Sequence, residues 1–196
     1  LFALESRDAV SEFDFLGFTL QYEMGYSNVV NMLSLAGIPI LANEREEGHP
    51  FVIGGGPCAY NAEPLADIFD FFVLGEGEEV LTPILDTYIE WKKRGGTRRE
   101  YLERVALIEG VYVPSLYNVR YNEDGTIKSV LPVSDRFPER INKVIIKDLD
   151  KVFFPDRIIV PFTEIVHDRV MLEIFRGCTR GCRFCQAGMV YRPVRE

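Results

Sequence analysis

Short apolar runs alternate with stretches of helical periodicity through the first half of the chain, and this alternation limits the fold more than any other feature. The apolar runs lie at residues 13–20, 38–41, 51–53 and 71–74. Each is short, rich in aromatic or branched side chains and close to turn residues, so each predicts a buried strand. Strands separated by helices form βαβ units with parallel strands and right-handed crossovers. The fold class expected for residues 1–96 is therefore α/β, a parallel sheet with flanking helices.

Three helices are expected between and after these strands. The first begins near Ser27, whose hydroxyl can cap it, and ends at Gly37. The second covers about residues 58–69. The third has a wide apolar face, is opened by residues 75–78 and ends at Gly95. These helices supply the crossovers that a parallel sheet needs.

Two glycine-rich turns follow the third and fourth expected strands, at the edge where the carboxyl ends of the strands meet. In open α/β sheets, ligands bind at this edge. Free backbone N–H groups can cradle a ligand there, but a tight turn can also need glycine for its geometry alone. Both explanations stay open for the first turn, whereas Glu76 and Glu78 are better explained by the dipole of the following helix. The candidate ligand-binding residues are Gly54, Gly55, Gly56, Pro57, Gly75, Glu76 and Gly77.

The pattern changes beyond the long helix. A short helix is expected over residues 98–108, and strand alternation follows at 111–113, 116–121 and 127–133. Asn122–Gly125, between the last two, is typical of a hairpin turn. This part of the chain therefore predicts a β-hairpin rather than another βαβ unit.

The last third of the chain is expected to connect the sheet to a second domain. Residues 134–168 mix charged stretches with three prolines, which indicates an extended connector. Residues 169–175 predict a strand, and a helix is expected to start at Phe184. The expected division is residues 1–96 for the α/β domain, 97–168 for the connector with its hairpin, and 169–196 for the start of a further domain.

The distribution of charged residues also separates the first half of the chain from the second. The net charge is −8, yet residues 1–91 hold 16 acidic and 2 basic residues, whereas residues 92–196 hold 14 acidic and 20 basic ones. The acidic half argues against nucleic acid binding there, while the basic half permits it. No apolar run approaches the roughly 18 residues of a membrane span. The absence of such a run predicts no membrane partner. Clustered cysteines without disulfide spacing predict a reducing, cytoplasmic location.

Three cysteines cluster near the end of the printed sequence, at Cys178, Cys182 and Cys185. Thiolates bind zinc, copper(I) or iron in clusters, and three protein ligands leave one coordination position open. A closed zinc site needs a fourth ligand, but neither His49 nor His167 has suitable spacing. A 4Fe–4S cluster with one open iron fits better, because the flanking glycines and arginines suit a bulky, negatively charged core.

The motif resembles the signature of the radical S-adenosylmethionine (SAM) superfamily, in which an aromatic residue, here Phe184, precedes the last cysteine. Residues 173–188 resemble the branch with a cobalamin (B12)-binding-like domain in front of the radical SAM barrel. The turns at 54–57 and 74–78 are similar to those of that Rossmann-like, flavodoxin-type domain. On this resemblance, residues 169–196 would be the first strand and cluster loop of a TIM-type barrel, and the chain would be a fragment, inactive by itself.

The resemblance implies cofactors and a reaction. Cys178, Cys182 and Cys185 would each bind one iron of a 4Fe–4S cluster, and SAM would chelate the fourth. An electron from a donor such as flavodoxin or ferredoxin would cleave SAM to a 5′-deoxyadenosyl radical, which abstracts hydrogen from the substrate. Phe184 would lie near the adenine or make an ordinary core contact.

Alternative functions stay open beside this one. The α/β domain could be a module that binds a small molecule or a corrinoid, with zinc or no metal at the cysteines. Cobalamin binders often use an Asp-x-His-x-x-Gly stretch, which this sequence lacks. An RNA-modifying radical SAM enzyme is a further alternative that the basic second half permits.

Overall fold

The computed structural model describes residues 1–155, 157, 163–164, 166, 169 and 171–196. Contacts divide the chain into two units, Leu1–Ile145 and Ile146–Glu196. His167, Val170 and part of the expected connector lie outside the described residues.

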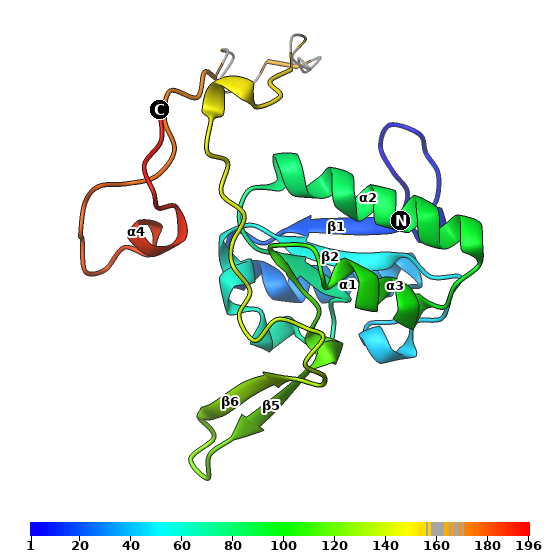
Figure 1. Ribbon diagram of the computed structural model, residues 1–196. Helices are drawn as coiled ribbons and strands as arrows, with labels where there is room; N and C mark the ends of the chain where they lie inside the picture. The colour runs from blue at the N-terminus through cyan, green and yellow to red at the C-terminus, as the bar shows by residue number, and fades with distance from the viewer. Residues whose placement is uncertain (156, 158–162, 165, 167–168, 170) are drawn as a thin grey trace. The chain divides into compact units, whose positions relative to one another are not determined.

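A four-stranded sheet forms the centre of the first unit (Figure 1). Its strands are β1 (Phe15–Thr19), β2 (Phe51–Gly55), β3 (Phe71–Val73) and β4 (Val111–Tyr112), in that spatial order. The first three strands are parallel, and β4 is antiparallel to β3. The predicted α/β class with a parallel sheet and flanking helices is therefore confirmed, and the arrangement is Rossmann-like.

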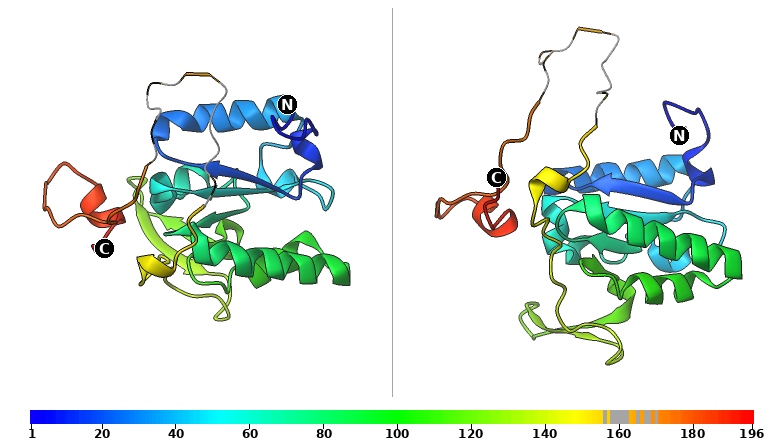
Figure 2. Two further views of the ribbon diagram at one scale, coloured as in Figure 1. Left: turned by 90° about the horizontal axis from the view of Figure 1, so that it is seen from above. Right: turned by 45° about the horizontal axis from the view of Figure 1, so that its top comes forward.

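Each face of the sheet carries its own hydrophobic core, because successive strand side chains point to opposite sides. Helices α2 (Gly77–Arg94) and α3 (Arg98–Val105) pack on one face, in the core that contains Phe51 of β2. Helix α1 (Tyr26–Ala36) packs in the other core, with the next strand residue, Val52. Figure 2 shows the helices on the two sides of the strands. The expected long helix and its end at Gly95 are confirmed, as is the end of α1 at Gly37.

The sheet core continues past the boundary expected at residue 96. Tyr101 of α3 is fully buried, and Val111 of β4 is 1% exposed; both lie in the core that α2 covers. Residues 97–145 therefore belong to the first unit in this division.

Shorter elements complete the described chain. The expected hairpin is present as β5 (Tyr117–Tyr121) and β6 (Ile127–Pro132), which pair with each other only and project from the body of the first unit (Figure 1). Among the described residues, no helix has the length and apolar character needed to cross a membrane. The remaining elements are η1 (Val10–Glu12), η2 (Glu23–Gly25), η3 (Ala42–Glu44), η4 (Pro57–Asn61), η5 (Glu63–Leu65), η6 (Pro114–Leu116), η7 (Leu149–Lys151) and α4 (Ala187–Val190).

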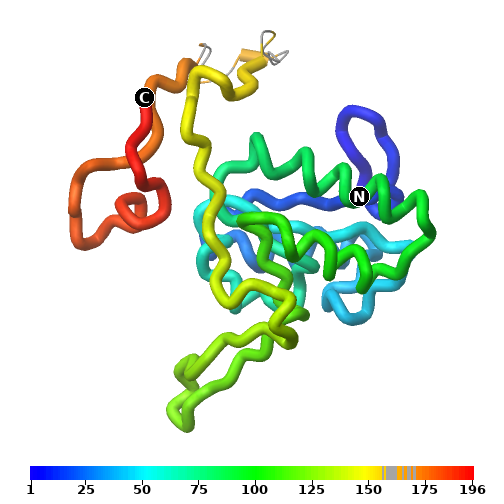
Figure 3. The backbone as a smooth tube through the Cα atoms, in the orientation of Figure 1, coloured from blue at the N-terminus to red at the C-terminus, as the bar shows by residue number. Residues whose placement is uncertain are grey.

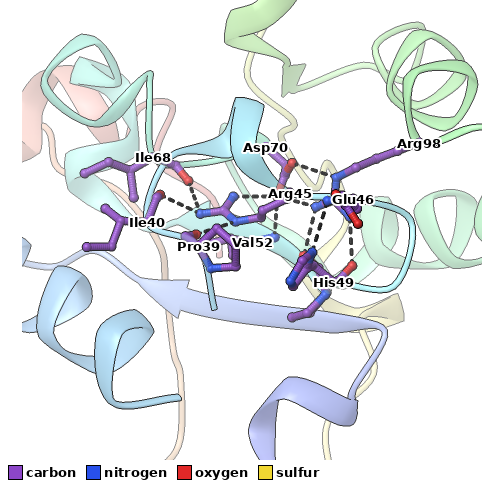
Figure 4. Close-up of polar contacts among 10 residues, drawn as sticks. Pro39, Ile40, Arg45, Glu46, His49, Val52, Ile68, Asp70 and Arg98 are labelled. Atoms are coloured by element: carbon purple, nitrogen blue, oxygen red, sulfur yellow. Dashed lines mark hydrogen bonds and ion pairs between the residues drawn. The ribbon is translucent and has the colours of Figure 1, made fainter. Parts of the chain in front are cut away.

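A buried carboxylate joins three parts of the first unit (Figure 4). Asp70, just before β3, accepts hydrogen bonds from Arg45 Nη1 and Arg98 Nη2, both at 2.8 Å. It also accepts from the backbone N–H of Val52 in β2 at 2.7 Å. The side chains of Asp70, Arg45 and Arg98 are 1%, 0% and 9% exposed. We call these three residues the Arg–Asp–Arg triad.

The strand expected at residues 38–41 is absent, so this prediction is wrong, and the contacts of Arg45 explain why. Its guanidinium donates to the carbonyls of Pro39, Ile40 and Ile68 at 3.0, 2.8 and 2.6 Å. Because an arginine side chain takes carbonyls that a sheet would otherwise use, the segment stays irregular and passes beside the sheet instead of joining it.

Arg98 fixes the start of α3 in a similar way. It donates to the carbonyls of His49 and Pro50, each at 2.8 Å, and its guanidinium lies 3.9 Å from the centroid of the Phe51 ring. Thr97 caps the helix with a capping box, accepting from a backbone N–H three residues on. The first turn of α3 is thus attached to the chain that leads into β2.

Two other expected elements are wrong. The helix expected over residues 58–69 is replaced by η4 and η5, because Pro64 lacks an N–H and its ring opposes a continuous helix. The strand expected over 169–175 does not form in its described part, residues 169 and 171–175, since no strand of the described chain pairs with it there. The helix expected from Phe184 begins at Ala187.

We predict that Asp70→Asn strongly destabilises the first unit. The amide keeps the shape but removes the charge that offsets two buried guanidinium groups, and breaking a buried ion pair costs about 3–5 kcal/mol. Urea unfolding followed by circular dichroism measures the change in the free energy of unfolding. Asp67→Asn, at an exposed position nearby, is the matched control; equal effects of the two changes would contradict the role assigned to the triad.

Candidate functional site

The three clustered cysteines lie in the second unit, on a loop that turns back on itself (Figure 3). Cys178 is half-buried, while Cys182 and Cys185 are exposed, and all three are free thiols. Cys185 N–H donates to the carbonyl of Cys182 at 3.1 Å, which forms a tight turn between them. The short helix α4 follows directly. The motif therefore stands on a loop before a helix, as the sequence predicts, but no strand precedes it among the described residues of 169–177.

The ends of this loop are held together by backbone contacts. Arg176 and Arg195 form two hydrogen bonds, N–H to carbonyl in each direction, at 2.9 and 3.0 Å. Gly177, with φ of 100°, lies between them and the cysteines. A Cβ added to Gly177 would come within 2.6 Å of the carbonyl oxygen of Pro193. Glycine is therefore required where the returning chain crosses the start of the motif.

The loop suits an iron–sulfur cluster in its donor chemistry. It carries three free thiols, and residues 176–195, both ends included, contain five arginines and no acidic residue, while Arg176 pairs with Glu173 just outside this stretch. Soft thiolate donors with neighbouring positive charge match the needs of a negatively charged cluster. The thiols are not gathered around one point: among the described residues, no three His, Cys, Asp or Glu side chains are placed to hold a single metal ion.

Phe184 makes no core contact in the described structure. Its side chain is 93% exposed beside the last cysteine of the motif. The sequence left two explanations open for Phe184, a contact with the adenine of SAM or packing in a core. The structure does not show core packing in this unit.

The first glycine turn, residues 54–57, is filled by protein. A Cβ on Gly54 would lie 2.8 Å from the Phe72 ring, and one on Gly56, with φ of 89°, would lie 3.1 Å from the carbonyl oxygen of Leu20. That same carbonyl accepts from the N–H of Cys58 at 2.9 Å. Close packing accounts for these glycines, and the turn leaves a corrinoid no free cradle at Gly56.

The second glycine turn is occupied in the same way. Gly75 has φ of 104°, and a Cβ there would lie 2.2 Å from the carbonyl oxygen of Val144. Val144 accepts from the N–H of Glu76 at 3.1 Å and donates to the carbonyl of Leu74 at 2.9 Å. Glu76 is the residue before α2, and Gly77 begins that helix. The chain's own backbone thus lies at the carboxyl end of β3, where a ligand was expected.

Sequence reasoning missed a cavity of about 950 Å³ in the first unit. It lies beside the triad and under the hairpin, and its lining includes Glu63, Tyr112, Tyr117, Val119 and Tyr121. Tyr112 donates to Glu63 Oε1 at 2.9 Å, and burial, followed by the nearby carboxylate, raises the pKa of that tyrosine far above its usual value. The signal was present in the sequence: Tyr117, Val119 and Tyr121 alternate along one strand and so share one face.

With both sites described, comparison with known proteins places the chain in a family. Residues 1–114 match the family described as "Radical SAM proteins, N-terminal". The match covers the α/β sheet and its helices but not the cysteine loop. The chain belongs to this family, and the predicted membership of the radical SAM superfamily is confirmed.

A curated relative is similar over the whole chain. It is an uncharacterized protein of Methanocaldococcus jannaschii, 28% identical over 200 residues, which cover 100% of this chain and 35% of the relative. The chain thus spans about a third of that relative's length. No solved structure matches.

We predict that Gly75→Ala destabilises the first unit by about 2 kcal/mol or more, because it adds strain at positive φ and displaces the Val144 backbone. Thermal unfolding measures the effect. Gly48→Ala is the control, since a Cβ there meets nothing within 4 Å. A Gly75→Ala protein as stable as the control would show that Val144 does not occupy this turn.

Proposed function

We propose that the protein is a radical SAM iron–sulfur enzyme, or the amino-terminal part of one. Cys178, Cys182 and Cys185 would bind three irons of a 4Fe–4S cluster, leaving the fourth for SAM. The observation that carries the proposal is the pairing of two independent features in one chain. Three free thiols at C-x3-C-x2-C spacing follow a domain that matches the radical SAM amino-terminal family over other residues.

The cluster, when bound, supplies the electron that cleaves SAM to methionine and a 5′-deoxyadenosyl radical. The residues of this chain have other tasks: the thiolates hold the irons, and the arginines of the loop offset negative charge. Phe184, exposed beside Cys185, is free to contact the adenine of SAM. Residues 169–196 would form the start of a TIM-type barrel whose other strands are supplied outside residues 1–196.

The basic loop also supports the expected electron donor. Arg180, Arg183 and Arg192 of this loop are exposed and form a basic surface to which an anionic flavodoxin or ferredoxin can be attracted. A cytoplasmic location follows from the need for reduced thiols. RNA as substrate is compatible with the charge of residues 92–196.

A second candidate function is that of a binding module, and the cavity under the hairpin favours it. A site of about 950 Å³ whose lining includes three tyrosines and Glu63 is large enough for a cofactor-sized molecule. The glycine turns, which the resemblance pointed to, are filled by Leu20 and Val144 instead. A small-molecule site in the first unit would therefore lie in this cavity and not at the turns.

We predict that the chain takes up an iron–sulfur cluster through the three clustered thiols. After anaerobic reconstitution with iron and sulfide, we expect brown absorbance, a paramagnetic signal on reduction with dithionite, and a change in that signal on adding SAM. Replacing Cys178, Cys182 and Cys185 by serine should abolish the brown absorbance, the paramagnetic signal and its response to SAM. Cys58→Ser is the control, because Cys58 is buried and burial raises the pKa of its thiol. A colourless protein that binds zinc would support the binding module.

We also predict that the visible spectrum of hydroxocobalamin is unchanged when the chain is added. The reason is that backbone occupies both glycine turns and that the Asp-x-His-x-x-Gly stretch is absent. A spectral shift would contradict this prediction. Its loss in Gly56→Ala would then place the corrinoid at the turn, and its loss in Tyr121→Ala would place it in the cavity.

A further inference from the structure

The chain that follows the cysteines folds back and contacts the first part of the motif through one side chain. Arg192 Nε donates to the carbonyl of Cys178 at 3.3 Å, and Arg192 Nη2 donates to the carbonyl of Arg180 at 3.0 Å. A single guanidinium therefore bridges the two peptide groups that flank the Thr179–Arg180 peptide. Its planar donors suit this task, because they are fixed relative to one another.

The bridged segment makes a hydrogen bond to sulfur. The backbone N–H of Arg180 lies 3.4 Å from Cys178 Sγ. The two carbonyls that Arg192 holds belong to the residues at either end of this N–H···S contact. Fixing both carbonyls fixes the orientation of the peptides between them, and with it the direction of the N–H group.

Neighbouring residues make room for the guanidinium. A Cβ on Gly188 would lie 3.3 Å from the Arg180 carbonyl oxygen and 3.7 Å from Arg192 Nη2, so any larger residue would press on this contact. The crossing at Gly177 and Pro193, described above, brings the returning chain close to Cys178. Arg192 thus links the returning segment, residues 188–195, to the first part of the cysteine loop by two hydrogen bonds.

We propose that Arg192 is a positioning residue for the cluster: it orients the Cys178–Arg180 backbone so that the Arg180 N–H donates to the sulfur of Cys178. The inference rests on the proposed function, in which Cys178 is an iron ligand. Hydrogen bonds to cluster sulfurs stabilise the reduced, more negative state and thereby raise the reduction potential. Arg192 would act on the cluster through the backbone, without touching it.

The first test uses the chain without iron. Alkylation of the thiols by iodoacetamide, mapped by mass spectrometry, compares the half-buried Cys178 with the exposed Cys185. We expect Cys178 to react more slowly in the native chain and to approach the rate of Cys185 in Arg192→Gln. Arg183→Gln removes the same charge from the same loop at an exposed position and should leave the ratio unchanged. Equal ratios in all three proteins would overturn the proposal, whatever the cysteines bind.

The second test uses the reconstituted chain. Arg192→Gln should lose iron to a chelator about tenfold faster, as for other outer contacts of metal ligands, and its cluster should have a lower midpoint potential and a changed paramagnetic signal. Arg183→Gln reports the effect of lost charge alone, and Arg192→Lys, which keeps a donor, should recover part of the potential. If Arg192→Gln and Arg183→Gln shift the potential equally, only charge matters and the positioning role is wrong. If the native chain binds no cluster, the proposed function fails, while the result with iodoacetamide stands.

Discussion

The first unit depends on one buried carboxylate that binds two arginines. Asp70 lies between β2 and β3, and Arg45 and Arg98 bring to it two segments that have no strand pairing with the sheet. Desolvating three charges is costly, and the cost is offset only because backbone carbonyls and the N–H of Val52 satisfy nearly every polar group. In return, the triad fixes the positions of the irregular segment before β2 and of the first turn of α3.

The sequence predicted the parts of the fold that local pattern determines. β1, β2, β3, α2 and the hairpin follow from periodicity and turn residues, which act over a few neighbours. The wrong elements depend on features that apolar periodicity does not reveal. Residues 38–41 have the pattern of a strand, but the Arg45 side chain takes the carbonyls of Pro39 and Ile40. Pro64 interrupts the helix expected over residues 58–69. The antiparallel β4 pairs with a strand about 40 residues earlier, so its place in the main sheet could not be recognised from alternation alone.

The candidate sites also differ in how far local sequence pattern alone reveals them. The cysteine trio was found because its spacing is local, and the family match at residues 1–114 supports the same superfamily from different residues. For the first glycine turn the sequence left a ligand cradle and a purely geometric need for glycine both open, and the structure shows close packing: Gly56 and Gly75 make room for Leu20 and Val144, which come from elsewhere in the chain. The cavity under the hairpin was missed because it is built by several separate segments. A glycine pattern indicates that another group packs closely against the backbone, and only the structure shows that this group belongs to the protein itself.

The burial of Arg45 has a consequence for the electric field around the molecule. Residues 1–91 contain two basic residues, and Arg45, one of them, is withdrawn from the surface and neutralised by Asp70. Only Arg7 remains to moderate the 15 other acidic residues of this stretch, so its outward potential is strongly negative. Under the proposed function, an anionic electron donor would be repelled by this surface and attracted by the arginines around the cysteines. The residue that secures the fold thereby also leaves the surface charge of residues 1–91 more negative than the sequence count alone suggests.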